Sequence, residues 1–259
     1  MTRLMLALVL IAPVAAHAED AVSQTVGHGQ VDWSKQTVTA TGSGAPSLKA
    51  ANAAVARLGA ERAAKLDAYR NVLEAVRGVR VSGKQTAGAA ADASPEVKAK
   101  LEGVVQGFKT VDTKYYSDGG VDVIIQGPLD GVVTAIVGPG AKSALPLPDD
   151  GTSGVIIDAK GLGMTPALAP HVLDEQGNEV YTASMVASDN LRRQGVAGWA
   201  KSLETAKKDG RVGAKPAILK AEKLWEAGSS DLVLAAADAE KLRKWGGLLS
   251  SAAVVIVTD

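Results

Sequence analysis

Cysteine is absent from this 259-residue sequence, and several other residue types are scarce. Without cysteine the chain can form no disulfide and can carry no lipid on an amino-terminal cysteine. Aromatic residues make up 3% of the chain, which leaves few platforms for stacking bases or sugars. Basic and acidic residues each number 28, so no net charge draws nucleic acid or anionic lipid to the whole surface. Stability must therefore come from packing.

Residues that carry chemistry are equally scarce. Beyond the first 18 residues the only histidines are His28 and His171, and neither lies in the kind of cluster that predicts a metal site. The run Gly42-Ser43-Gly44 lacks the G-x-S-x-G pattern of a hydrolase nucleophile, and His171 has no visible catalytic partner. The sequence thus predicts no catalytic residue, no metal, no cofactor and no nucleic-acid partner. We expect a protein that is not an enzyme.

The first 18 residues have the pattern of an export signal. Arg3 supplies a positive start, residues 4–14 form an apolar run, and Ala16-His17-Ala18 matches an A-x-A cleavage site. This apolar run is too short to cross a bilayer, which takes about 20 residues. We expect cleavage after Ala18, no transmembrane segment in the mature chain, and residence in the periplasm. Peripheral contact with the outer membrane stays open.

The longest predicted element is a helix from Ser47 to Val76, where apolar side chains recur at helical spacing. Pro46 before it and Gly78 after it are typical of helix ends. The apolar stripe consists of Leu48, Ala51, Val55, Leu58, Leu66, Tyr69, Leu73 and Val76. We expect this stripe to be core, so that Leu66→Ala would cost about 2–5 kcal/mol. Alanines between Ala50 and Ala64 also make the helix narrow enough to approach a sheet or a partner helix closely.

The other patterns predict an α+β fold with two small domains. In the first, residues 31–137, the long helix packs on a small antiparallel sheet. Residues 138–153 are rich in proline and glycine and are predicted as a linker. A second, mixed α/β sheet domain follows at residues 154–259. Residues 19–30 are predicted as a flexible arm, and residues 83–94 as a loose loop.

The sharpest hint of a ligand is Gly42-Ser43-Gly44, which is predicted as part of a turn between a strand and the long helix. A glycine turn at that place could hold an anion on the amide groups of the helix start. However, the third glycine of a dinucleotide motif is missing, and Pro46 removes one amide. The alternative interpretation is a plain connector that binds no ligand, and the pattern favours this alternative.

Several motifs resemble one known family. The segments 31–33 (Val-Asp-Trp), 39–46, 67–74 and 78–81 look like the small outer-membrane lipoprotein family that includes the flagellar proteins FlgP and, in its amino-terminal domain, FlgT. The resemblance covers residues 31–137. It implies an envelope protein that assembles rather than catalyses, with some relatives forming rings or disks around the flagellar basal body. Relatives of the lipoprotein type carry a cysteine after the signal, so this chain fits periplasmic residence better than direct anchoring.

Two functions from different classes follow. The first is a non-catalytic envelope protein that assembles as a homo-oligomer or with envelope partners, with association with the flagellum as one form. The second is a periplasmic protein that binds a small ligand at the Gly42–Pro46 turn or in the linker cleft. In the second domain, segments 154–163 and 177–181 are similar to larger members of the lipoprotein family named above. The missing chemistry and the resemblance favour the first function.

Overall fold

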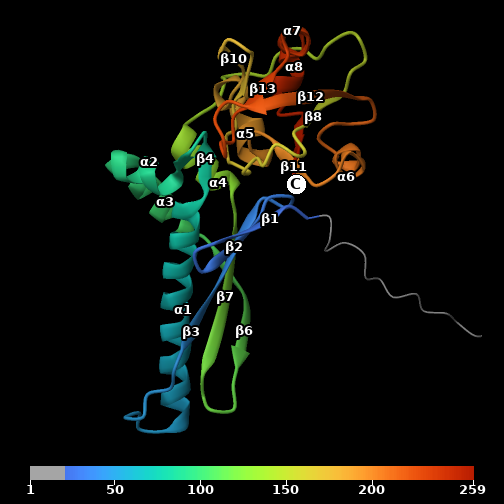
Figure 1. The fold of residues 1–259 in the computed structure, drawn as a ribbon. Coiled ribbons are helices and arrows are strands. Elements are labelled where there is room, and N and C mark those ends of the chain that lie inside the picture. The colour runs from blue at the N-terminus through green and yellow to red at the C-terminus, as the bar shows by residue number, and fades with distance from the viewer. Residues whose placement is uncertain (1–20) are drawn as a thin grey trace, which may run out of the picture.

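The computed structural model describes residues 21–259 (Figure 1). The predicted signal sequence, with Ala16 and Ala18, lies outside the described residues. The structure has two parts. Residues 21–137 form the first part, and residues 154–259 form the second, which we call the head. We call the projecting lower portion of the first part the stalk. It comprises residues 53–70 of helix α1 (Ala53–Gly78), the end of strand β3 (Thr37–Gly44) and the hairpin of strands β6 (Lys109–Tyr115) and β7 (Val121–Pro128).

The first part is built on an antiparallel sheet of five strands in the order β1-β2-β3-β7-β6. The strands are β1 (Ser23–Val26), β2 (Gly29–Asp32), β3 (Thr37–Gly44), β6 (Lys109–Tyr115) and β7 (Val121–Pro128). Residues on β7 alternate between buried and more exposed, so Val121, Val123 and Ile125 share one face. That face is covered by α1 (Ala53–Gly78). The predicted α+β fold, with a long helix on a small antiparallel sheet, is confirmed.

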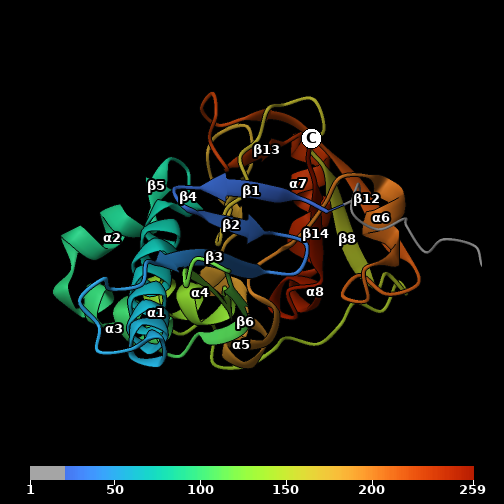
Figure 2. The same ribbon diagram turned by 90° about the horizontal axis from the view of Figure 1, so that it is seen from below.

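The flexible arm predicted at residues 19–30 is wrong where the structure describes it. Strands β1 and β2 pair with each other, and β2 pairs with β3. Val22 is buried, and its amide donates a hydrogen bond to Ser34 Oγ at 2.9 Å. Small polar side chains do not prevent a segment from pairing its backbone with a neighbouring strand, so composition was a poor guide. Figure 2 shows β1, β2 and β3 side by side across the underside of the molecule.

The loose loop predicted at residues 83–94 is also wrong. The segment contains β5 (Gln85–Thr86), which pairs with β4 (Arg80–Ser82), and the helix α2 (Ala87–Ala93). Helix α3 (Pro95–Gln106) follows, with the Ser94 hydroxyl accepting from the Val97 amide and Pro95 in the first turn. Helix α4 (Asp130–Val137) ends this part. Alanine-rich sequence that looked unstructured therefore forms a short helix once its buried face has neighbours.

Helix α1 begins at Ala53 rather than Ser47, because the Asn52 side chain caps it by accepting from the Val55 amide at 2.9 Å. Its buried residues are Ala60, Ala64, Ala68, Val72, Ala75 and Val76. The predicted core stripe is therefore largely wrong. Leu66 is 64% exposed and Leu58 is 55% exposed, so a Leu66→Ala cost of 2–5 kcal/mol is no longer expected.

Glycines on β3 explain why alanines rather than leucines face the sheet. A Cβ on Gly42 would lie 1.9 Å from the amide nitrogen of Ala68, and one on Gly44 would lie 2.0 Å from the carbonyl oxygen of Ala60. The two backbones are so close that no larger residue fits on either side. The prediction that a narrow helix approaches a sheet closely is confirmed. The large side chains are left for the opposite face of the helix.

The head is a seven-stranded mixed sheet in the order β10-β9-β13-β12-β8-β14-β11. Its strands are β8 (Gly154–Asp158), β9 (Val172–Leu173), β10 (Glu179–Tyr181), β11 (Gly198–Ala200), β12 (Pro216–Leu224), β13 (Leu232–Leu234) and β14 (Val254–Val257). Strands β12, β8, β14 and β11 run parallel. All four residues of β14 are buried, as expected of a strand covered on both faces. The helical elements are η1 (Ala183–Met185), α5 (Ser188–Gln194), α6 (Leu203–Lys208), α7 (Ala236–Lys244) and α8 (Gly246–Ser250).

The larger of two clusters of buried apolar residues continues from the first part into the head. The rings of Trp33 and Trp199 meet edge to face, with centroids 6.0 Å apart. Gln36 donates from Nε2 to the carbonyl of Ala197 at 2.9 Å. On the other side of the junction, the amide of Gly83 donates to a carboxylate oxygen of Asp231 at 2.9 Å. The head is therefore held from two directions.

Candidate functional site

Residues 138–153 contain no helix or strand, yet part of this segment is fixed on the head. We call residues 141–150 the strap, because they cross the junction between α7 and α8. A Cβ on Gly247 would lie 1.9 Å from the carbonyl oxygen of Pro146, so glycine is needed for the strap to approach. The Leu145 amide donates to Ser250 Oγ at 2.8 Å. The predicted linker is thus partly a docked element.

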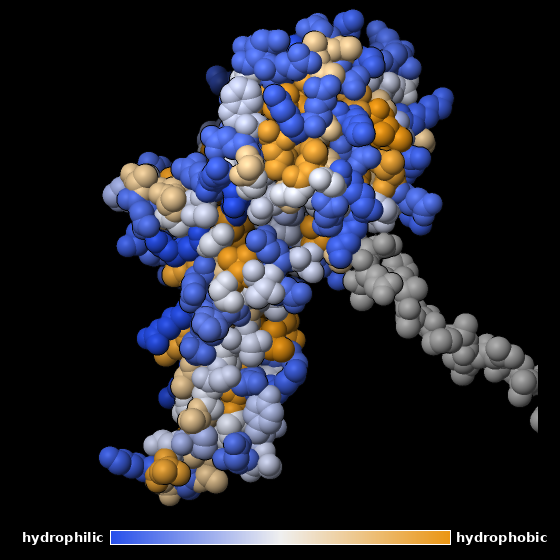
Figure 3. Space-filling model, in the orientation of Figure 1, coloured by the Kyte–Doolittle hydropathy of each residue, from blue (hydrophilic) through white to orange (hydrophobic). Residues whose placement is uncertain are grey.

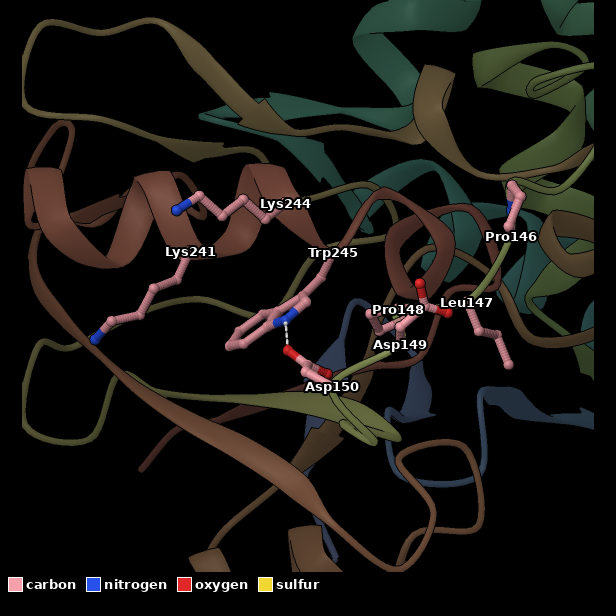
Figure 4. Close-up of a pocket in the computed structure, with 8 residues that line it drawn as sticks. All are labelled: Pro146, Leu147, Pro148, Asp149, Asp150, Lys241, Lys244 and Trp245. Atoms are coloured by element: carbon pink, nitrogen blue, oxygen red, sulfur yellow. Dashed lines mark hydrogen bonds between the residues drawn. The ribbon is translucent and has the colours of Figure 1, made fainter.

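A pocket of about 420 Å³ opens between the strap and α7 (Figure 4). It is lined by Pro146, Leu147, Pro148, Asp149, Asp150, Lys241, Lys244 and Trp245. The indole of Trp245 lies in the middle and donates from Nε1 to Asp150 Oδ2 at 2.8 Å. This hydrogen bond, with another from the Thr152 amide, lowers the pKa of Asp150. The pocket therefore has an ordered aromatic wall and an ionised carboxylate.

The two lysines of this pocket extend from α7 on one side of the indole, and Pro146 and Leu147 lie on the other (Figure 4). Lys241 is paired with Asp238 of the same helix, 2.8 Å between Nζ and Oδ1. Both ammonium groups point away from the indole (Figure 4), so the lysines add positive charge at the edge of the pocket. The carboxylates of Asp149 and Asp150, which line the same pocket, partly offset that charge.

A second pocket, of about 430 Å³, lies beside residues 141–145 of the strap. Its walls are mainly apolar, with Leu145 of the strap facing Val180, Met185 and Leu249 of the head. Two charged residues, Glu179 and Arg243, also line it, and Arg243 is already paired with Asp174, with 2.6 Å between Nη2 and Oδ2. The two pockets therefore adjoin successive segments of the strap.

The predicted ligand turn is not a turn. Gly42, Ser43 and Gly44 are the last residues of β3 and pair with residues of β7. The Ser43 amide donates to Asp67 Oδ2 at 3.0 Å, and its hydroxyl donates to Asp122 at 2.6 Å. Because α1 starts only at Ala53, these residues do not lie beside free amides of a helix start. The predicted turn is therefore wrong, and ligand binding at these residues loses its structural basis, whereas the linker cleft has a counterpart in the strap pocket.

His171 lies at the junction of the two parts rather than in a pocket. Its Nδ1 is 3.6 Å from Oδ2 of Asp231, whose other oxygen accepts from the backbone of Gly83. The hydrogen bond to Asp231 raises the pKa of His171, against the effect of burial. Burial opposes ionisation of Asp231, but the bonds from His171 and Gly83 prevail and lower its pKa. The pair joins two elements and reaches no cavity described above.

The outer face of α1 is a second candidate binding surface, because it exposes large apolar side chains. We call Val55, Leu58, Arg62, Leu66, Tyr69 and Leu73 the outer stripe, since they lie on the side of α1 away from the sheet. Val55, Leu58 and Leu66 are each at least half exposed. Figure 3 shows such hydrophobic patches on the stalk as well as on the head. Exposed aliphatic side chains in a row on one helix are typical of a binding surface.

Among residues 21–259, no three histidines or acidic residues are placed to hold a metal ion. Over the same range, no helix combines the length and the hydropathy needed to cross a bilayer. The sequence could not have revealed the strap pocket, because nothing in a proline-rich linker says which helix it will lie on. Its only local signal was Trp245 followed by two glycines.

The fold and its surfaces define a two-part α+β protein with a stalk and a strapped head. A family model described as Treponema pallidum Tp0624, second domain, matches residues 154–259, which is the head as defined above. No curated protein matches the chain. The match covers less than half of the chain and does not bear on residues 31–137. The resemblance of that segment to the lipoprotein family stays a prediction.

Proposed function

We propose that this protein is a non-catalytic component of the cell envelope that works by binding other protein molecules through its stalk. The observation that carries the proposal is the outer stripe, three of whose aliphatic side chains are at least half exposed. The resemblance to a family of assembling envelope proteins, the export signal and the scarcity of reactive residues support it. Periplasmic residence and association with the flagellum belong to the same proposal.

The physical reason is that the stalk needs no large residue on this face for its own folding. Its contact with the sheet is made by alanines against glycines, and the leucines contribute little to it. Burying a leucine side chain is worth about 1.5–3 kcal/mol, and this energy is available to a partner. A stalk that presents such a row away from the head gives the partner room to approach.

Photo-crosslinking in cells tests this function. A photoreactive amino acid at Leu66 is expected to give discrete covalent protein adducts, whereas the same group at Ile218 on the head is expected to give none. Ile218 is a matched control because it is 47% exposed and lies outside the stalk. No adduct at Leu66, or the same adducts from both positions, would contradict the proposal. The adduct masses separate self-assembly from binding to another protein.

A second candidate, small-ligand binding in the linker cleft, is favoured by the Trp245 pocket. Its ordered indole suits a ring, and Lys244, which forms no ion pair among residues 21–259, is available to a carboxylate on that ring. Glucuronate and benzoate are suitable probes, read out by quenching of tryptophan fluorescence in the wild type and in Trp245→Phe. Saturable quenching that disappears in Trp245→Phe, but persists in Trp225→Phe, would support this candidate. Unsaturable quenching in all three proteins would rule it out for these probes.

A further inference from the structure

The outer stripe points to one kind of partner. We propose that it binds an amphipathic helix of a different protein, with aliphatic residues on one face and acidic residues along the edges of that face. This inference rests on the proposed function and specifies its partner. It is carried by three observations: the spacing of the stripe, the groove where α3 meets α1, and the distribution of charge on α1.

The spacing of the stripe suits a helix. Its members follow one another at intervals of three or four residues from Val55 to Leu73. This is the spacing by which two helices interlock along their length. A partner strand would instead need an unpaired edge or a flat face. The stalk's free edge at β6 carries Lys109, Asp112 and Lys114 and is interrupted by a register shift at Thr110–Asp112, features that oppose strand addition.

The chain already places one helix of its own on the upper end of the stripe. Helix α3 packs there, and a groove of about 300 Å³ remains between the two helices. It is lined by Leu66, Tyr69, Leu73 and Val105, together with Arg70, Glu102 and Gln106. The Tyr69 hydroxyl is held by a bond to the carbonyl of Phe108 at 3.1 Å, so one wall of the groove is fixed. A second helix could lie in this groove and continue down the stalk.

Charge on α1 is divided between its two sides. The acidic side chains turn toward the sheet: Glu61 accepts from the Tyr115 hydroxyl at 3.1 Å, and Asp67 accepts from the Ser43 amide. Arg62 lies in the stripe, and Lys65 and Arg70 lie beside it. Within residues 21–259 none of these three cations forms an ion pair or a side-chain hydrogen bond. The open face of α1 is therefore apolar and basic between Leu58 and Arg70, and the acid that lines the groove, Glu102, comes from α3.

This charge argues against a second copy of α1 as the occupant. Two outer stripes face to face would bring Arg62, Lys65 and Arg70 of both copies together without acids between them, and like charges at close range disfavour the pairing. Helix α3 of a second copy is no better, because its Lys98 and Lys100 lie between Glu96 and Glu102, and Glu96 is already paired with Lys100. An acidic helix from a different protein would pair with all three cations.

The shape argues against a bilayer. Helices α2 and α3 stand out from the same side of α1 that carries the stripe (Figures 1 and 2). A flat membrane surface would meet these helices before reaching the groove, whereas a single helix fits beneath them. The basic, apolar character of the stripe alone would suit anionic lipid as well. The concave corner with α3 is what favours a helix.

Two synthetic helices test the inference on the chain from Glu19 to Asp259. Both carry leucine at heptad positions a and d; one carries glutamate at e and g, and the other carries lysine. By fluorescence anisotropy, the glutamate helix is expected to bind at least about tenfold more tightly at low salt. The triple variant Arg62→Glu, Lys65→Glu, Arg70→Glu is expected to reverse this preference. The control Lys207→Glu, Lys208→Glu on α6 is expected to preserve it.

The variant Leu58→Ser, Leu66→Ser is expected to lose binding of both helices while keeping the melting temperature of the wild type, because both leucines are exposed. Equal binding of the two helices, or a preference that survives the triple reversal, would overturn the inference. So would saturable binding to phosphatidylglycerol vesicles that depends on Leu66, or a concentration-dependent dimer that Leu66→Ser abolishes. Cross-links from Leu66 without any preference between the helices would leave the proposed function standing and reject only the acidic partner.

Discussion

The head and the stalk bury opposite kinds of residue. In the head, Ile156 and Ile157 of β8 and the valines of β14 are fully buried between layers. In the stalk, alanines of α1 lie against glycines of β3, while Leu58 and Leu66 face solvent. Burial in the stalk is therefore set by how closely two backbones approach and not by how apolar a side chain is. A core built this way leaves large apolar residues available for binding.

The largest expected effect tests this comparison with one buried aliphatic residue of the head and one exposed aliphatic residue of the stalk. Ile156→Ala should lower the free energy of unfolding by about 2–5 kcal/mol, because it removes methyl groups from a site with no exposure. Leu66→Ala should change it by less than about 0.5 kcal/mol. Urea titration of both variants measures the difference. Equal losses would mean that the outer face of α1 is buried in the isolated protein.

A second test addresses the close approach itself. Gly42→Ala should destabilise the protein by about 1–3 kcal/mol, because its Cβ would lie 1.9 Å from the Ala68 amide nitrogen and the helix would have to move away. Thermal unfolding followed by circular dichroism measures the change. A neutral Gly42→Ala would show that α1 and β3 are not in contact at this position.

Local signals in the sequence predicted the elements whose ends are decided by neighbouring residues. Ser94 and Pro95 predicted the start of α3, and Gly78 predicted the end of α1. These features depend on hydrogen bonds and dihedral angles within a few residues, which a single sequence contains.

Which face of α1 packs on the sheet depended instead on residues that are distant in the sequence. The periodicity of Leu58 and Leu66 is real, but the face that packs was decided by Gly42 and Gly44, which looked like a turn. The strap was not predicted for the same reason, since the backbone of Pro146 approaches Gly247, which is distant from it in the sequence. Periodicity reveals that a helix has an apolar face; it does not say whether the monomer or a partner covers that face.

A smaller effect concerns the junction between the two parts. The raised pKa of His171 means that its ion pair stabilises the fold fully below about pH 6.5 and less as pH rises through the folded value. The lowered pKa of Asp231 means that its contribution is lost as pH falls below about 4. His171→Gln should therefore cost about 1 kcal/mol near pH 5.5 and much less above pH 8. Urea titrations at several pH values test this, and a cost independent of pH would contradict an ionic role.

The smallest expected effect has the opposite sign and completes the comparison within one helix. A Cβ on Gly59 would meet no atom within 4 Å, since this residue lies on the exposed side of α1. Gly59→Ala should therefore stabilise the protein by about 0.5–1 kcal/mol, because alanine loses less backbone entropy in a helix. The same substitution that is costly at Gly42 is thus favourable at Gly59, and thermal unfolding of the two variants side by side measures both. Destabilisation by Gly59→Ala would mean that the outer face is already occupied, so that the stalk associates before any partner is added.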